Sequence, residues 1–441
     1  MNLSKYQSSK IAILGFGREG KSTLNFLLKH GISPIQITIL DQKEIEKSDL
    51  PEGMVCISGQ DYLSDLDSYD IIFKTAGMSY NSTLLVVKDK LMTQVQFFFD
   101  NFRGKVIAIT ASKGKTTMTS MAYSLLQNAG FPVILAGNIG KPVLDQISNF
   151  DDPDQYVVIE LSSFMLETLV KKNFISILGS IFPVHLDWHG NMENYLRAKA
   201  RILLGSETNI MLSSSYEHFF SPQPALPENL VLTGKNTPYT RDKSAFYSSS
   251  KKLFDLSEIQ LLGEHNLRNI SAIVALASKM GISDEILVDT IRNFAPVRHR
   301  LQKVGTFRGI DFYDDAISTS PFSSIAALDA LGDQVDTLFL GGVDGRYDFS
   351  ALVDRIKKSQ IRNLVLFPDS GQTIATLLAS DLDKYNVIHT RSMEEGVRFA
   401  YDHTSPGKIA LLSTATPSFS LRKDFEEKGD LFQEWVIKLG G

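Results

Sequence analysis

The fold is decided by one stretch of the chain, Val106-Ile-Ala-Ile-Thr-Ala-Ser-Lys-Gly-Lys-Thr-Thr117, in which an apolar run leads into a glycine-lysine turn. The run has the length and β-branched content of a buried strand, and residues 116–128 have a helical pattern. Backbone N–H groups in such a turn can surround phosphate oxygens while the lysine neutralises their charge. The standard phosphate-binding loop has a glycine where this chain has Ile109. Taken alone, the turn therefore indicates either a nucleotide site or merely a charged helix start.

Outward from this turn, short apolar runs alternate with longer helical patterns, as is typical of parallel sheets whose strands are connected by helices. The apolar runs predict strands at 10–14, 36–40, 71–74, 106–110, 133–136, 156–161, 176–183, 309–314, 337–340, 363–367, 387–389 and 408–412. The helical patterns lie at 21–30, 116–128, 195–199, 263–280, 321–331 and 350–358. Residues 213–251 are rich in serine and proline and predict short strands or loops, and 293–300 has the character of a linker.

The length of 441 residues fits two or three domains, and the alternation favours three. We predict an α/β protein made of three successive α/β domains. They are a Rossmann-like N-terminal domain, a central domain of the P-loop ATPase type and a Rossmann-like C-terminal domain, at residues 1–98, 99–296 and 297–441.

The composition excludes several classes of protein. Hydrophobic residues make up 43% and charged residues 22% of the chain, which is ordinary for a globular protein. The net charge of −5 argues against a nucleic-acid binder that works through a broad basic surface. The single cysteine, Cys56, cannot form an internal disulfide, so a reduced, cytoplasmic setting is expected. No apolar run approaches the roughly 20 residues of a membrane span.

A second glycine turn, Gly15-Phe-Gly-Arg-Glu-Gly20, follows the first predicted strand, and Asp41 ends the next one. Glycines at this spacing let a pyrophosphate approach the backbone at a helix N-terminus. A purely structural tight turn has the same pattern, so both interpretations stay open. The kind of nucleotide cannot be read from the turn.

Three further side chains follow predicted strands of the central region. Glu160 ends an apolar strand, at the edge where ligands of open parallel sheets bind, and its carboxylate suits Mg²⁺. His185 follows the next strand, where a histidine is more often a loop residue than a ligand. Lys199 belongs to an amphipathic helical pattern, and on sequence alone it is expected on the solvated face.

These motifs, taken in order, resemble the Mur ligase family along essentially the whole chain. The branch most similar is the one that joins glutamate to UDP-N-acetylmuramoyl-L-alanine. The motifs are Thr110–Thr117, Gly137-Asn-Ile-Gly140, Glu160-Leu-Ser-Ser-Phe-Met-Leu-Glu167, His185-Leu-Asp-Trp-His-Gly190, Tyr195-Leu-Arg-Ala-Lys199, Gly263-Glu-His-Asn-Leu-Arg-Asn269, His299-Arg-Leu301, Gly341-Gly342 and Phe425-Glu-Glu-Lys-Gly-Asp-Leu-Phe432.

The resemblance implies a role for each motif. ATP would contact Thr110, Ala111, Ser112, Lys113, Gly114, Lys115, Thr116, Thr117, Asn266, Asn269, Arg300 and Asp315. The catalytic set would be Lys115, Glu160, His185 and Lys199. Thr116 would bind the first Mg²⁺, Glu160 and His185 would attend a second Mg²⁺ position, and a carbamate formed by CO₂ on Lys199 would be a further oxygen ligand for Mg²⁺. The UDP-sugar substrate would contact Gly15, Phe16, Gly17, Arg18, Asp41, Thr75, Gly77 and Asn138, and glutamate would contact Thr319, Arg346, Ser418 and Phe425.

The reaction implied by the resemblance is the ATP-dependent formation of an amide bond through an acyl phosphate, in the cytoplasmic synthesis of peptidoglycan precursors. It would serve the cell wall, cell shape and cell division, in a monomer with no nucleic-acid or membrane partner. Two other classes of protein fit the motifs less well. An NAD-linked oxidoreductase built on Gly15–Gly20 leaves the second glycine turn unexplained. A non-catalytic nucleotide-binding relative would be favoured by loss of Lys115, Glu160 or Lys199, and all three are present.

The chain departs from the family pattern at three places. Ala111 replaces a glycine of the ATP loop, which stiffens the turn. Ile317 stands where a lysine is usual, and Val343-Asp-Gly-Arg346 stands where another glutamate-contacting lysine is expected. The last two changes affect recognition of the amino acid. D-glutamate is expected by family default, with L-glutamate as the alternative.

Overall fold

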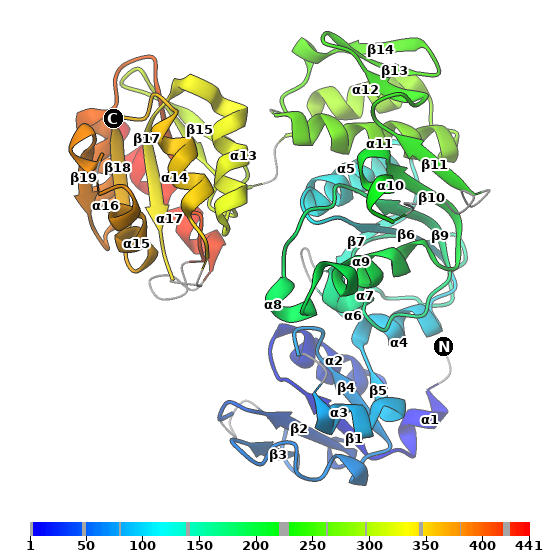
Figure 1. Ribbon diagram of the computed structural model, residues 1–441. Helices are drawn as coiled ribbons and strands as arrows, with labels where there is room; N and C mark the ends of the chain where they lie inside the picture. The colour runs from blue at the N-terminus through cyan, green and yellow to red at the C-terminus, as the bar shows by residue number, and fades with distance from the viewer. Residues whose placement is uncertain are drawn as a thin grey trace. The chain divides into compact units, whose positions relative to one another are not determined.

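The computed structural model describes residues 3–45, 50–78, 81–137, 142–219, 229–261, 263–295, 298–343, 347–379, 381–417 and 424–441. By its contacts the chain divides into two compact units, Met1–Glu258 with Arg268–Asn293, and Ile259–Leu267 with Phe294–Gly441 (Figure 1). In the described part of the chain, no helix is both long and apolar enough to cross a membrane.

The N-terminal part of the first unit is a five-stranded parallel sheet of order β3-β2-β1-β4-β5. All four residues of the central strand β1 are buried, as expected for a strand covered on both faces. Its strands are β1 (Ile11–Leu14), β2 (Ile37–Asp41), β3 (Val55–Ser58), β4 (Ile71–Lys74) and β5 (Leu91–Met92), and its helices are α1 (Ser4–Gln7), α2 (Arg18–Lys29), α3 (Ser82–Val86) and α4 (Gln94–Asn101).

The central part is a six-stranded parallel sheet of order β11-β10-β9-β6-β8-β7, with a small antiparallel sheet of order β12-β13-β14. Its strands are β6 (Lys105–Thr110), β7 (Val133–Gly137), β8 (Tyr156–Glu160), β9 (Asn173–Leu178), β10 (Ser206–Leu212), β11 (Leu230–Thr233), β12 (Tyr239–Arg241), β13 (Ala245–Ser248) and β14 (Lys251–Asp255). Its helices are α5 (Lys115–Asn128), α6 (Val143–Gln146), α7 (Ser163–Leu166), α8 (Leu186–His189), α9 (Met192–Ala200), α10 (Ser213–Phe219), α11 (Glu264–Met280) and α12 (Asp284–Asn293).

The C-terminal part is a six-stranded sheet of order β15-β16-β20-β17-β18-β19, parallel except for the β15–β16 pair. Its strands are β15 (Gln302–Phe307), β16 (Ile310–Asp314), β17 (Val335–Gly341), β18 (Asn363–Phe367), β19 (Asn386–His389) and β20 (Ile409–Leu412), and its helices are α13 (Pro321–Leu331), α14 (Ser350–Lys357), α15 (Ser370–Leu377), α16 (Met393–His403) and α17 (Phe425–Gly440).

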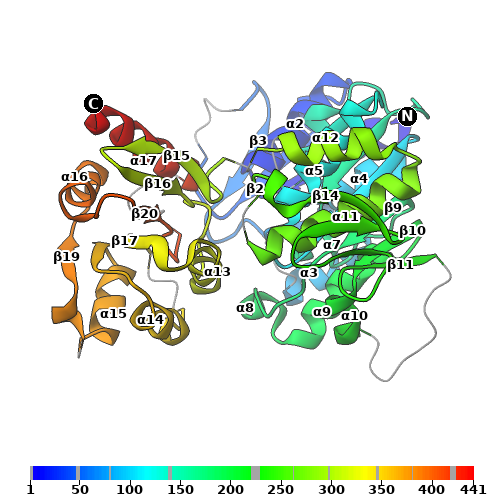
Figure 2. The ribbon, with the colours of Figure 1, turned by 90° about the horizontal axis from the view of Figure 1, so that it is seen from above.

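This C-terminal sheet has a separate core on each face, because successive side chains of a strand point to opposite sides. In β17, Leu338 and Leu340 join a core with residues of α13, α14 and α15, whereas Phe339 joins a core with residues of α16 and α17. Figure 2 shows the two sets of helices on opposite sides of the sheet. The arrangement is that of a doubly wound α/β domain.

The predicted α/β class is confirmed, and helix 321–331 and strand 363–367 have the predicted bounds. Two predictions are wrong in detail. Strand β9 ends at Leu178 instead of residue 183, because the chain then turns so that Ser180 O accepts the N–H of Ser112 at 2.7 Å. Residues 213–251 contain helix α10 as well as strands. The predicted boundary at 98/99 falls within α4, the one at 296/297 lies outside the described residues, and the domain limits remain predictions.

Candidate active site

The glycine-lysine turn lies at the carboxyl end of β6 and opens α5. Gly114, the N-cap of α5, has a left-handed φ of 87°, and a Cβ there would overlap the Asn269 side chain. No side chain caps the start of α5, so the positive end of this helix is open to an anion. This geometry favours the nucleotide interpretation of the turn over that of a merely charged helix start.

Lys115 folds back over the turn that precedes it. Its ammonium group donates to Ala111 O at 3.1 Å and to Ser112 O at 3.2 Å. The side chain therefore lies along the inside of the turn, as phosphate neutralisation requires. The buried hydroxyl of Ser112 contacts the Tyr195 hydroxyl at 2.5 Å, which ties the turn to α9.

Thr116 and Glu160, which the family resemblance assigns to two different Mg²⁺ positions, lie beside each other in the structure. The Thr116 hydroxyl donates to Glu160 Oε2 at 2.9 Å, and the glutamate is only 1% exposed, at the end of β8. A hydroxyl beside a carboxylate is a set of hard oxygen donors that suits Mg²⁺. Within the described ranges, no three His, Cys, Asp or Glu side chains are grouped closely enough to hold a metal ion. His185, at the N-cap of α8 with φ 57°, packs its ring against Phe164 at 5.0 Å.

The prediction that Lys199 lies on a solvated face is wrong, because its side chain is buried beneath the turn with 1% exposure. Its ammonium group donates to Thr110 Oγ1 at 2.7 Å and to Ala111 O at 3.0 Å. Burial lowers the pKa of Lys199 well below its ordinary value, the nearby Lys115 lowers it further, and Glu160 opposes the shift. Both lysines donate to the same carbonyl, so their nitrogens are no more than about 6 Å apart.

The glycines in and near the N-terminal turn are of two kinds: some are required by the backbone conformation and others are not. Gly15 has φ 92°, and a Cβ at Gly20 would overlap Gly15 O, so the fold itself requires these two. Neither Gly17 nor Gly77 has a left-handed φ, and a Cβ at either would meet no described protein atom within 4 Å. Open space beside two glycines that the fold does not require supports the close approach of a ligand.

Carboxylates already occupy two backbone donors of this N-terminal region. Asp41 Oδ2 accepts from Phe16 N at 2.6 Å, and Glu19 Oε2 accepts from Ala76 N, next to Thr75, at 3.1 Å. Burial raises the pKa of Glu19. A cavity of about 170 Å³ adjoins the turn and is lined by Arg18, Glu19, Gln94, Val95, Gly137, Pro142, Val143 and Met165. Asn138 lies outside the described residues.

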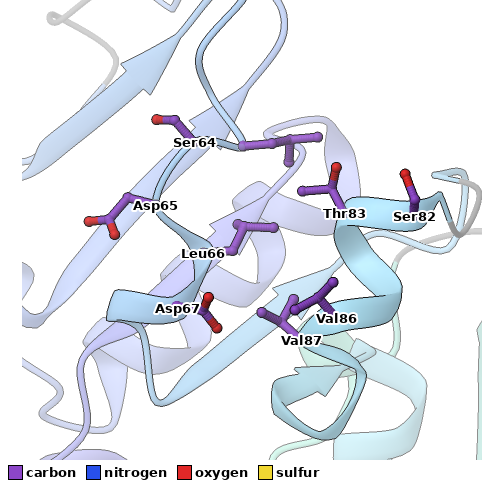
Figure 3. A pocket seen from close by; sticks show the side chains of 9 residues that line it. Ser64, Asp65, Leu66, Asp67, Ser82, Thr83, Val86 and Val87 are labelled. Carbon is purple, nitrogen blue, oxygen red and sulfur yellow. The ribbon is translucent and has the colours of Figure 1, made fainter.

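A larger cavity of about 430 Å³ lies elsewhere on the N-terminal sheet, between residues 63–67 and 82–87 (Figure 3). No residue assigned to the UDP-sugar substrate lines it. It is therefore separate from the candidate substrate site.

In the C-terminal unit, Asp315 is 2% exposed and accepts from Leu301 N at 3.2 Å and from Ser413 Oγ at 2.8 Å. Burial raises its pKa to about 6, although the charge of Arg300 opposes this shift. Thr319 and Phe425 are both partly buried, whereas Arg346 and Ser418 lie outside the described residues. In α11, Asn266 and Asn269 are 4% and 1% exposed.

The sequence analysis did not identify the buried cation Lys428 of α17, which is 2% exposed and donates to Thr414 Oγ1 at 2.6 Å. Burial lowers its pKa to about 8, while Asp314 and Asp315 raise it. Lys428 lies three residues after Phe425 and four before Phe432, on the apolar stripe of the helix. The spacing of the apolar residues along the helix therefore could have identified Lys428 as a buried lysine.

The chain is similar to known proteins along nearly its whole length. The Mur ligase middle domain matches residues 109–277. UDP-N-acetylmuramoylalanine–D-glutamate ligase of Acetivibrio thermocellus is 31% identical over 98% of this chain and 97% of its own, and that of Geobacillus kaustophilus is 31% identical over 98% of each.

Two solved structures share the fold. UDP-N-acetylmuramate-alanine ligase MurC of Thermotoga maritima has a TM-score of 0.64 at 17% identity, over 98% of this chain and 100% of its own. MurF ligase of Thermotoga maritima in complex with ADP has a TM-score of 0.58 at 15% identity, over 99% and 97%. Two relatives that are 31% identical to this chain each match 98% of it, and the family's middle domain matches residues 109–277, so the protein belongs to the Mur ligase family.

Proposed function

We propose that the protein is an ATP-dependent ligase that joins glutamate to the alanine carboxylate of UDP-N-acetylmuramoyl-L-alanine, in peptidoglycan precursor synthesis. The observation that carries the proposal is the convergence of Lys115 and Lys199 on Ala111 O, beside the Thr116–Glu160 pair. The names of the two relatives that are 31% identical over nearly the whole chain support the substrates.

The reaction has two steps. The alanine carboxylate attacks the γ-phosphorus of ATP, and the bond between this phosphorus and the β-phosphate oxygen breaks. ADP is the leaving group, and the substrate now carries an acyl phosphate. The glutamate amine then attacks the acyl carbon, loses a proton, and phosphate leaves. Lys115, inside the turn, faces the charge that develops on the transferring phosphoryl group, and the open start of α5 adds its dipole. Mg²⁺ bound by Thr116 and Glu160 would neutralise further phosphate charge.

Lys199 is proposed to react with CO₂. Burial disfavours the charged form of Lys199, and repulsion from the Lys115 ammonium group, about 6 Å away, adds to this effect. The pKa of Lys199 is therefore well below its ordinary value, which makes the uncharged amine that reacts with CO₂ easier to form. The lone pair of its nitrogen forms a bond to the carbon of CO₂, one C=O electron pair moves to oxygen, and the nitrogen loses one proton. The product is a carbamate whose two oxygens share one negative charge. A cation would thereby become an oxygen donor suited to Mg²⁺ near Thr116 and Glu160.

Phosphate and ADP release tests the proposal. Release should require ATP, UDP-N-acetylmuramoyl-L-alanine and glutamate together. Nucleotide binding without release under all these conditions would indicate a non-catalytic relative, and turnover with NAD instead of ATP would indicate an oxidoreductase. We further propose a cytoplasmic monomer without nucleic-acid or membrane partners, whose oligomeric state is measured by light scattering.

The handedness of glutamate is the finer part of the proposal, and D-glutamate is named first as the family default. Both carboxylates need cationic or donor partners, which Ile317 cannot supply. We propose Thr319, Phe425, Arg346 and Ser418 as the residues that line the glutamate site. Phosphate release with each pure enantiomer decides the matter. Strong preference for the L-isomer would replace the default, and turnover with neither would point to another amino acid.

A further inference from the structure

The two C-terminal residues assigned to ATP each adjoin a member of a buried pair. Arg300 follows His299, and Asp315 follows Asp314. His299 and Asp314 are 1% and 0% exposed, and His299 Nδ1 donates to Asp314 Oδ2 at 2.7 Å. A buried, directed bond therefore connects the two short segments that carry Arg300 and Asp315.

Backbone hydrogen bonds reinforce this connection. Ile317 N donates to His299 O at 3.1 Å, and Leu301 N donates to Asp315 Oδ1 at 3.2 Å. Both neighbours of Arg300 have left-handed φ angles, 60° for His299 and 42° for Leu301. Non-glycine residues adopt such angles only where their surroundings hold them, so the backbone on either side of Arg300 depends on this network.

Helix α17 packs directly against this hydrogen-bond network. A Cβ at Gly429 would overlap His299 Nδ1, so the imidazole lies directly against the helix backbone. Gln433, one turn further, donates to Asp314 Oδ2 at 2.7 Å and to Gln302 Oε1 at 3.2 Å. Gln302 Oε1 also accepts from His299 N at 3.0 Å. The helix thus contacts both members of the buried pair.

We propose that Gly429 and Gln433 are positioning residues for ATP: through His299 and Asp314 they set where Arg300 and Asp315 meet the nucleotide. The proposal rests on the proposed function, which assigns Arg300 and Asp315 to ATP. It gives a reason for the presence of glycine inside a 16-residue helix, where alanine would be more favourable.

The test compares Gly429→Ala, His299→Ala and the double variant, with Glu434→Ala as the control for an exposed residue of the same helix. Gly429→Ala should raise the KM for ATP about tenfold or more, because displacements near 1 Å are costly in a preorganised site. The KM for UDP-N-acetylmuramoyl-L-alanine should stay within about twofold, since that substrate is assigned to the N-terminal sheet. In the His299→Ala background, Gly429→Ala should add nothing, because the overlap is gone. Glu434→Ala should behave as the wild type.

Nucleotide binding is measured in parallel by calorimetry with the ATP analogue AMP-PNP. Wild-type protein that binds no nucleotide would refute the proposed function itself. Wild-type binding with an unchanged KM for ATP in folded Gly429→Ala would refute the positioning role alone. Should Gly429→Ala fail to fold, Gln433→Leu removes the hydrogen bonds without an overlap. It is expected to raise the KM for ATP in the same selective way, and an unchanged value would refute the proposal.

Discussion

Replacing Lys199 with methionine should abolish activity without destabilising the protein. The structure gives the reason, because both hydrogen-bond partners of this lysine keep another bond. The Thr110 hydroxyl also donates to Leu161 O at 2.6 Å, and Ala111 O also accepts from Lys115 at 3.1 Å. Methionine fills a similar volume and carries no charge that burial penalises. We therefore expect Lys199→Met to be at least as stable as the wild type at pH 7.

The difference in unfolding free energy between the wild type and Lys199→Met should depend on pH. The folded pKa of Lys199 is lowered by burial, so between that pKa and the ordinary 10.5 the unfolded chain binds one more proton than the folded one. The unfolding free energy of the wild type should therefore rise with pH relative to Lys199→Met, by about 1.4 kcal/mol per pH unit. Urea unfolding of both proteins in CO₂-free buffer measures it.

Activity separates the carbamate from a simple cation. Lys199→Arg keeps a positive charge but cannot react with CO₂, so both Lys199→Arg and Lys199→Met should lose about 10²-fold or more in phosphate release. Wild-type activity should fall in CO₂-free buffer and return with bicarbonate. A fully active Lys199→Arg variant would refute the carbamate, and a pH-independent difference in stability would refute the lowered pKa.

Other substitutions test the remaining parts of the site. Lys115→Ala should reduce phosphate release about 10²-fold or more at saturating ATP, and near-normal turnover would remove the turn from the active site. Asp315 has its pKa raised to about 6, so its folded form binds more protons than the unfolded chain between pH 4 and 6, and stability falls as pH rises there. Asp315→Asn should therefore gain about 3 kcal/mol in unfolding free energy relative to the wild type over that interval, measured by urea unfolding, while losing ATP affinity. Ile317→Lys should lower the KM for glutamate if glutamate binds beside residue 317, and steady-state kinetics with both enantiomers measures the change.

Features set by neighbouring residues could be predicted from the sequence. Helix α13 has its predicted bounds because Ser320 caps its first turn, Pro321 fits its first position and Gly332 follows its end. The position of Glu160 at the end of a strand could likewise be predicted from the apolar run that precedes it. Such signals lie within a few residues of the feature they specify.

Features set by distant residues could not be predicted. The amphipathic pattern around Lys199 specifies a helix with a buried face, but not that this face meets Thr110, 89 residues away. The contact of Gly429 with His299 could not be predicted for the same reason. A single glycine in a helical pattern does not indicate that an imidazole ring packs against it. The same difficulty applies to Glu19. In the sequence it is an ordinary acidic residue in the first turn of a helix, whereas in the structure its carboxylate accepts from Ala76 N, just after the end of β4.

The departure at Ala111 has a compensating partner in the fold. Ala111 is fully buried, and a Cβ at Gly179 would lie 3.0 Å from the Ala111 methyl, so the glycine at 179 leaves room for the alanine at 111. The left-handed φ of the turn falls at Gly114, which remains glycine. The alanine therefore adds no strain to the turn, and its carbonyl still accepts from both Lys115 and Lys199. Because that shared carbonyl holds the two lysine nitrogens within about 6 Å of each other, the turn maintains the charge repulsion that, together with burial, lowers the pKa of Lys199.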